Sequence, residues 1–91
     1  MKLNDEQKEV VIKCGAFGYD AEKLANILEL SVEVVEIEIK KKTSDIAICY
    51  KLGIDRFDFS IDSRLLQMAQ SGDIKALEKL EFRKKMRKTK R

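Results

Sequence analysis

The chain has 91 residues, the length of one small domain, and a formal net charge of +3 at neutral pH. It has no histidine, and its two cysteines, Cys14 and Cys49, form no CxxC pair, so we expect reduced thiols, no zinc site and no Cys–His nucleophile. No run approaches the ~20 apolar residues of a membrane span, and the N-terminus lacks the apolar core of a signal peptide, so we expect a soluble, cytoplasmic protein.

The charge is distributed unevenly along the chain. Residues 83–91 hold seven of the 19 basic residues and none of the 16 acidic ones. Residues 1–82 therefore carry 12 basic and 16 acidic side chains. A basic cluster of this kind predicts contacts with the phosphates of a polyanion such as DNA, or a solvated tail that contacts only protein partners.

The first predicted helix begins after Asn4, which forms the pattern of a capping box with Gln7. Gly15 is expected to end it. Its buried stripe is expected to consist of Val10, Val11 and Cys14. The two aromatic residues of the following turn, Phe17 and Tyr19, are expected to fill the same core.

The run from Gly18 to Ser31 has the pattern of a helix-turn-helix. Asp20 is expected to cap a second helix over about residues 21–29, and Ser31 a third helix over about residues 32–42. The apolar residues that share a stripe on the second helix are Leu24, Ala25, Ile27 and Leu28. In a helix-turn-helix, the N-terminal half of the second helix contacts the base edges of DNA. In this chain that helix is the third one, over about residues 32–42. Its outward residues would be Glu33, Glu36 and Lys40, and the two glutamates would repel phosphate.

A strand is the alternative for the third segment, because residues 32–39 are rich in β-branched side chains and residues 35–39 alternate between apolar and acidic. Such a strand could pair with the alternating residues 57–62 as a two-stranded ribbon, although an isolated ribbon is marginal. We expect the helix, because a capped turn precedes it. That helix would have two nearly opposite apolar faces, and hence two packing partners. The faces are Val32, Val35 and Ile39 on one side and Val34 and Ile37 on the other.

A long helix is predicted from about residue 44 to residue 70, because apolar residues recur at spacings of three and four. This stripe consists of Ile46, Tyr50, Ile54, Phe57, Ile61, Leu65 and Met68. Gly72 is expected to end the helix, and Asp73 to cap a last helix that runs to about Met86 and folds back antiparallel. The buried face of that last helix is expected to be Ile74, Leu77, Leu80 and Phe82. The predicted fold class is therefore all-α, with a three-helix helix-turn-helix unit followed by an αα-hairpin.

The sequence offers no catalytic constellation. Its acidic cluster at residues 33–38 has no histidine beside it, and Asp55, Asp58 and Asp62 are expected to form ion pairs within the long helix or a subunit contact. There is no Gly-rich phosphate loop and no nucleophile elbow. We therefore expect a protein that is not an enzyme and needs neither a metal nor another cofactor.

Four segments have a recognisable arrangement. Gly-Tyr-Asp-x-x-x-Leu-Ala-x-x-Leu occupies residues 18–28, Tyr-Lys-Leu-Gly and Ile-Asp-Ser-Arg-Leu-Leu lie in the long helix at 50–53 and 61–66, and Gly-Asp-x-x-Ala-Leu forms the break at 72–77. In this arrangement the chain resembles the small terminase subunits of tailed bacteriophages over about residues 10–85. Glu29 stands where the turn of a helix-turn-helix often has glycine.

The resemblance implies an N-terminal unit that binds double-stranded viral DNA (residues 1–42), a hairpin that builds a ring of identical subunits (43–82) and a basic tail that binds DNA or the large motor subunit (83–91). The host cytoplasm would be the location of such a phage protein. The implied DNA-facing residues are Ser31, Lys40, Lys41, Lys42, Arg83, Lys84, Lys85, Arg87, Lys88, Lys90 and Arg91. The implied assembly surface is Ile46, Tyr50, Phe57, Ile61, Leu65, Leu77 and Leu80.

Two other functions are compatible with the same residues. A cellular helix-turn-helix regulator or adaptor would use the tail for nonspecific DNA contacts and would be a monomer or dimer. A helical protein-binding scaffold would have no affinity for DNA.

Overall fold

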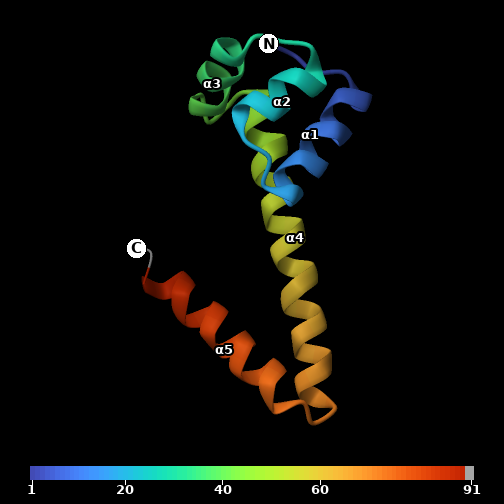
Figure 1. Ribbon diagram of the computed structural model, residues 1–91, viewed down its shortest axis with the longest axis vertical. Coiled ribbons are helices and arrows are strands. Elements are labelled where there is room, and N and C mark those ends of the chain that lie inside the picture. The colour runs from blue at the N-terminus through green and yellow to red at the C-terminus, as the bar shows by residue number, and fades with distance from the viewer. Residues whose placement is uncertain (90–91) are drawn as a thin grey trace. The chain divides into compact units, whose positions relative to one another are not determined.

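The computed structural model describes residues 1–89 of the chain, and this part contains five helices and no strand (Figure 1). The helices are α1 (Asp5–Phe17), α2 (Ala21–Leu28), α3 (Val32–Lys40), α4 (Asp45–Gln70) and α5 (Ile74–Thr89). The predicted all-α fold class is confirmed. The alternative ribbon is wrong, because residues 35–39 lie in α3 and residues 57–62 lie in α4.

The chain divides into two compact units, an N-terminal unit (Met1–Phe57) and a C-terminal unit (Asp58–Arg91). The N-terminal unit contains α1, α2, α3 and the first half of α4. The predicted boundary at residue 42 leaves that half of α4 out of the unit. The C-terminal unit contains the second half of α4 and α5, which folds back from it.

The starts of four helices are set by local capping bonds. Asn4 and Gln7 form a complete capping box. The side chain of Asn4 accepts a hydrogen bond of 2.7 Å from the backbone N–H of Gln7, and the side chain of Gln7 accepts one of 3.0 Å from the backbone N–H of Asn4. Asp20, Ser31 and Asp73 each accept a hydrogen bond from the backbone N–H three residues further on, at 2.9, 3.2 and 3.1 Å. These bonds satisfy N–H groups that have no partner within the helix. All four predicted caps are confirmed.

The end of α1 corrects one prediction. The helix continues through Gly15 to Phe17, and Gly18 caps it with φ at 73°. Gly15 is buried because its missing side chain leaves space for α4: a Cβ atom there would overlap the backbone carbonyl of Tyr50. Gly53 on α4 has the same role toward α1, since its Cβ would overlap the carbonyl of Ile12. The two glycines therefore allow the backbones of α1 and α4 to come into close contact.

The core of the N-terminal unit is small and draws on every helix in it. Its largest fully buried side chains are Val11 of α1, Leu24 of α2, Val35 of α3 and Ile46 of α4. The other buried apolar side chains of this core are Leu3, Cys14, Ala25 and Cys49. Both thiols are unpaired and buried, and this burial raises the pKa of Cys14 and of Cys49.

The aromatic residues after α1 have different environments. Tyr19 packs against the core, and its backbone carbonyl accepts a hydrogen bond of 2.7 Å from the hydroxyl of Tyr50. Phe17 is 63% exposed, so the prediction that it fills the core is wrong. The centres of the Phe17 and Tyr19 rings lie 5.3 Å apart. The ammonium of Lys23 lies 4.5 Å from the centre of the Tyr19 ring and forms a cation–π contact with it. Phe17 therefore lies at the surface, with its ring beside the ring of Tyr19.

Glu38 carries a buried charge and is 5% exposed. The pattern of the sequence does not indicate a partner for it. Its carboxylate lies 3.3 Å from the ammonium of Lys41 and 3.3 Å from the amino group of Met1. The ion pair with Lys41, and next that with the Met1 amino group, lower the pKa of Glu38, although burial opposes its charged form. These two cations compensate for the removal of the carboxylate from water.

Acidic pH is therefore expected to weaken the N-terminal unit through Glu38. A carboxyl group whose pKa is lowered by folding stabilises the fold above its unfolded-state pKa, about 4.3 for Glu, and this contribution is lost as the pH falls through the folded-state pKa. We expect Glu38→Gln to reduce stability at pH 7 and to flatten the loss of stability below about pH 4.5. Urea unfolding between pH 3 and pH 7 measures both effects. Glu36→Gln, at an exposed position of α3, is the matched control, and a wild-type pH profile for Glu38→Gln would contradict the assignment.

Candidate nucleic-acid interface

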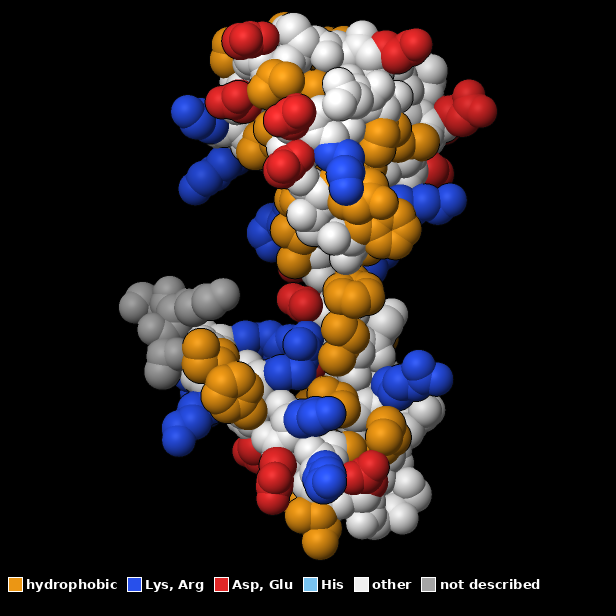
Figure 2. Space-filling model, in the orientation of Figure 1, with side chains coloured by type: hydrophobic (Ala, Val, Ile, Leu, Met, Phe, Trp, Pro, Cys, Tyr) orange, Lys and Arg blue, Asp and Glu red, His pale blue; other side chains and the backbone are white. Residues whose placement is uncertain are grey.

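The outward face of α3 is acidic and apolar. Ser31 uses its hydroxyl to cap the helix, at 3.2 Å from the N–H of Val34. Beyond it, Glu33, Glu36 and Ile37 are exposed, and Figure 2 shows acidic side chains gathered over this part of the N-terminal unit. Carboxylates at the N-terminal half of the second helix of a helix-turn-helix repel the phosphates that flank a groove. The predicted reading surface is therefore poorly suited to DNA.

The turn from α2 to α3 is made without glycine. Glu29 caps α2 in the left-handed conformation with φ at 58°, and its N–H donates to the carbonyl of Ala25. A non-glycine residue rarely adopts this conformation. The turn nevertheless places Ser31 at the cap of α3, so the helix-turn-helix spacing is compatible with Glu29.

The three lysines at the end of α3 have different neighbours. Lys40 is exposed at the last position of the helix. Lys41 pairs with Glu38 at 3.3 Å. Lys42 lies on the edge of an apolar groove beside α4. The phosphate contact expected of these three lysines stays a prediction.

Two of the predicted C-terminal cations are bound to α4. Arg83 donates to Asp62 at 2.7 Å and to Asp58 at 3.2 Å, and Arg87 donates to Asp62 at 2.6 Å. Partial burial opposes the charged form of Asp62, but the hydrogen bonds from Arg83 and Arg87 outweigh it and lower the pKa of Asp62. The sequence predicts ion pairs of Asp58 and Asp62 within α4 or with another subunit. They instead connect α4 to α5.

The three lysines between and beyond these arginines remain exposed. No carboxylate of residues 1–89 lies within ion-pair distance of Lys84, Lys85 or Lys88. With Leu77 and Phe82 they border a shallow depression of about 670 Å³, which Glu78 and Glu81 also line. Figure 2 shows basic side chains along this helix. We call Lys84, Lys85 and Lys88 the lysine face.

The predicted basic tail is in large part helical. α5 continues to Thr89, beyond the predicted end near Met86. The lysine face is therefore held on a regular helix, and the ion pairs of Arg83 and Arg87 attach that helix to α4. Lys90 and Arg91, the last two predicted DNA contacts, lie outside the described residues.

The predicted assembly residues divide into three groups. Ile46 is 0% exposed in the core, so its assignment to a surface is wrong, and the half-buried Tyr50 bonds to the backbone of Tyr19. Phe57 and Leu77 are 48% and 47% exposed. The remaining members are half-buried within the C-terminal unit: Ile61, Leu65 and Leu80.

The buried face of α5 also differs from the prediction. Ile74 and Phe82 are 71% and 63% exposed, whereas Ala76 is 2% exposed. The inward stripe follows spacings of four, three and four, as expected for one face of a helix, and it contains two arginines. It consists of the buried Ala76, the half-buried Leu80 and Arg83, and the exposed Arg87, which reaches Asp62. Arginines are normally assigned to solvent, so apolar periodicity missed this face, and the aspartates spaced four apart on α4 were the available signal.

The C-terminal unit leaves much apolar surface exposed. Ala76 is the one apolar side chain of residues 58–88 that is fully buried. The large apolar side chains that are 41% to 73% exposed include Phe59, Leu66, Met68, Ile74, Leu77 and Phe82. Exposed apolar patches of this kind are typical of interaction surfaces.

No helix within residues 1–89 is long and apolar enough to cross a membrane. Comparisons of the chain with protein-family models, with curated proteins and with solved structures give no match.

Proposed function

We propose that this protein is a non-catalytic, self-associating DNA-binding protein that serves DNA packaging in the manner of a phage small terminase subunit. The observation that carries the proposal is the lysine face. It presents three exposed ammonium groups, none within ion-pair distance of a carboxylate of residues 1–89, on a helix that ion pairs attach to α4. In this proposal the large motor subunit is the protein partner.

The lysine face would bind the phosphate backbone without reading bases. Each ammonium group that neutralises a phosphate releases condensed counterions, and this release drives binding that depends on salt but not on sequence. The arginine–aspartate pairs contribute by holding α5, so that less side-chain and helix freedom is lost on binding. The acidic face of α3 takes no part in this mode.

Self-association would bury the apolar surface of the C-terminal unit. A segment this small and this poorly buried rarely gains enough stability without a partner. Residues 58–91 carry ten basic and five acidic side chains, which would repel another copy. The exposed apolar residues Phe59 and Leu66 lie on α4, however, whereas the lysine face lies on α5. Copies could therefore associate through α4 while each retains a phosphate-binding helix, and several such helices on one DNA raise the affinity by avidity.

The triple substitution Lys84→Gln, Lys85→Gln and Lys88→Gln tests the DNA-binding proposal. Each lost phosphate contact reduces the slope of log affinity against log salt by about 0.9, so we expect the slope to become shallower by about 2 to 3. The measurement is fluorescence anisotropy of a labelled DNA duplex at several salt concentrations.

The matched control makes the same change in charge in the N-terminal unit, with Lys2→Gln, Lys8→Gln and Lys13→Gln. We expect the control to retain the wild-type slope. An unchanged slope in the lysine-face variant, or an equal change in the control, would refute the assignment of the site.

Light scattering of the wild-type chain distinguishes the wider alternatives: a symmetric oligomer larger than a dimer supports the terminase-like function, a DNA-binding monomer or dimer supports a regulator, and absence of DNA affinity supports a scaffold.

A further inference from the structure

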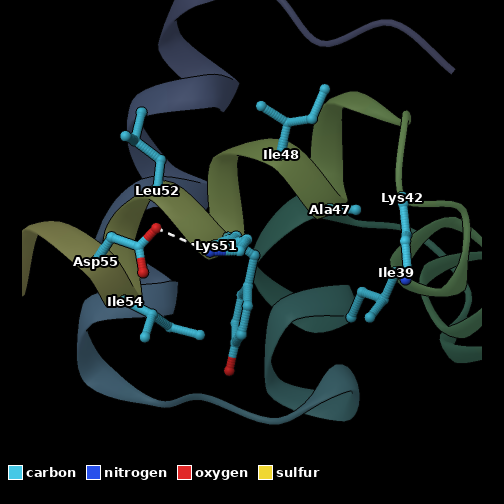
Figure 3. A pocket seen from close by; sticks show the side chains of 9 residues that line it. Ile39, Lys42, Ala47, Ile48, Lys51, Leu52, Ile54 and Asp55 are labelled. Carbon is cyan, nitrogen blue, oxygen red and sulfur yellow. Dashed lines mark hydrogen bonds and ion pairs between the residues drawn. The ribbon is translucent and has the colours of Figure 1, made fainter. Parts of the chain in front are cut away.

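An apolar groove lies on the N-terminal unit, between the end of α3 and the first half of α4, with a volume of about 560 Å³. Figure 3 shows Ile39 and Lys42 on one side of it, and Ile54 with the Lys51–Asp55 ion pair on the other. Its apolar lining comprises Ile39, Ala47, Ile48, Tyr50, Leu52 and Ile54. Ile48 and Ile54 are 52% and 39% exposed, so the groove offers apolar contact that this copy of the chain does not use.

The opposite side of α3 carries a second unused apolar surface. Val34 is 36% and Ile37 is 55% exposed, and Glu33 and Glu36 stand beside them. Ile37 and Ile39 are two residues apart on a helix, which places them about 160° apart around its axis. The groove and the Val34–Ile37 surface therefore face in different directions.

We propose that the Val34–Ile37 surface of one copy of this chain docks into the groove of a second copy. An amphipathic helix that places apolar side chains three residues apart in an apolar groove is a common mode of recognition. The charges complement each other, because Glu33 and Glu36 would meet the groove at its lysines.

Lys42 and Lys51 supply the positive edge of the groove. Lys42 has no carboxylate within ion-pair distance in the described part of the chain, while Lys51 pairs with Asp55 at 3.0 Å in an exposed contact. Exposed pairs of this kind contribute little energy and are readily exchanged for another carboxylate. A docked Glu36 would give Lys42 a partner.

This contact has a consequence for symmetry and another for function. Each copy would use two different surfaces, so the interface is heterologous and generates a ring or a filament instead of a two-fold dimer. It would also cover the acidic face of α3, which accounts for glutamates on a helix that would otherwise be expected to read DNA. The proposal rests on the N-terminal unit and is independent of the lysine face and of association through α4.

A photo-crosslinking experiment tests the contact directly. The full chain is prepared with p-benzoyl-L-phenylalanine in place of the exposed Ile37, in a light and a ¹⁵N-labelled form, and the two are mixed and irradiated. We expect mass spectrometry to find crosslinks from position 37 of one isotopic form to residues 47–54 of the other. Crosslinks confined to one copy, crosslinks to residues 58–89, or no crosslinks between copies would overturn the proposal and leave the groove for another protein.

Charge reversal in the same crosslinking chain provides the second test. Lys42→Glu is expected to reduce the yield between copies at least threefold, and adding Glu36→Lys to the same chain is expected to restore it, because both partners of the pair are then exchanged. Lys13→Glu makes the same change in charge on α1 and is expected to leave the yield unchanged. Circular dichroism verifies that each variant keeps its helix content. Failure of the double variant to restore the yield would contradict the proposed pairing, whatever the DNA-binding result.

Discussion

Replacing Gly53 by alanine is expected to destabilise the N-terminal unit by about 3 kcal/mol or more, the upper range for an overpacked contact. A Cβ atom at this position would overlap the backbone carbonyl of Ile12 on α1. A change of side-chain rotamer cannot relieve this overlap, because the overlapping atoms belong to the backbone. Helix propensity alone predicts the opposite sign, since alanine is favoured over glycine in a helix interior by about 1 kcal/mol. Urea unfolding followed by circular dichroism measures the difference.

The control for this substitution is Ser60→Ala, at an exposed position of the same helix. There the effect should be small, within about 0.5 kcal/mol, because only helix propensity changes. A Gly53→Ala variant as stable as the wild type would mean that α1 and α4 do not approach each other as closely as the structure has them.

Replacing Ile46 by alanine is expected to cost about 2 to 5 kcal/mol of unfolding free energy. The side chain is 0% exposed, so its loss removes buried apolar area and leaves a cavity in the small core. Ile74→Ala is the matched control, because Ile74 is 71% exposed and its truncation is expected to change stability by less than about 1 kcal/mol.

The Ile46 experiment also separates a core role from an assembly role. Light scattering on the folded variant should show the oligomeric state of the wild type, since the side chain contacts only its own unit. A variant of full stability but reduced mass would contradict its place in the core and support the assembly role that the apolar stripe of α4 suggests.

Local chemistry allowed the helices and their starts to be predicted. The caps at Asn4, Asp20, Ser31 and Asp73 act on backbone N–H groups three residues away, so the information lies within one turn of chain. The break at Gly72 is equally local, because this residue adopts φ at 101°.

Helix ends and buried faces depended on distant segments. Gly15 and Gly18 are both glycines near the end of α1, and only the approach of Tyr50 on α4 shows that Gly15 belongs inside the helix. The apolar stripe of α4 is continuous in sequence, but its first residue, Ile46, is in the core while Phe57 is exposed. Periodicity shows which residues share a face, and contacts with other elements show whether that face is covered.

The candidate site follows the same division. Composition was enough to identify residues 83–91 as the most basic part of the chain and α3 as an acidic helix, because charge is a property of each residue by itself. Which cations remain available for phosphate was decided by the fold, where Asp58 and Asp62 neutralise Arg83 and Arg87 and leave the lysine face exposed. The residues of these ion pairs lie 21 or 25 positions apart in the sequence. Whether they meet depends on how two helices pack, and patterns within one or two helical turns do not carry that information.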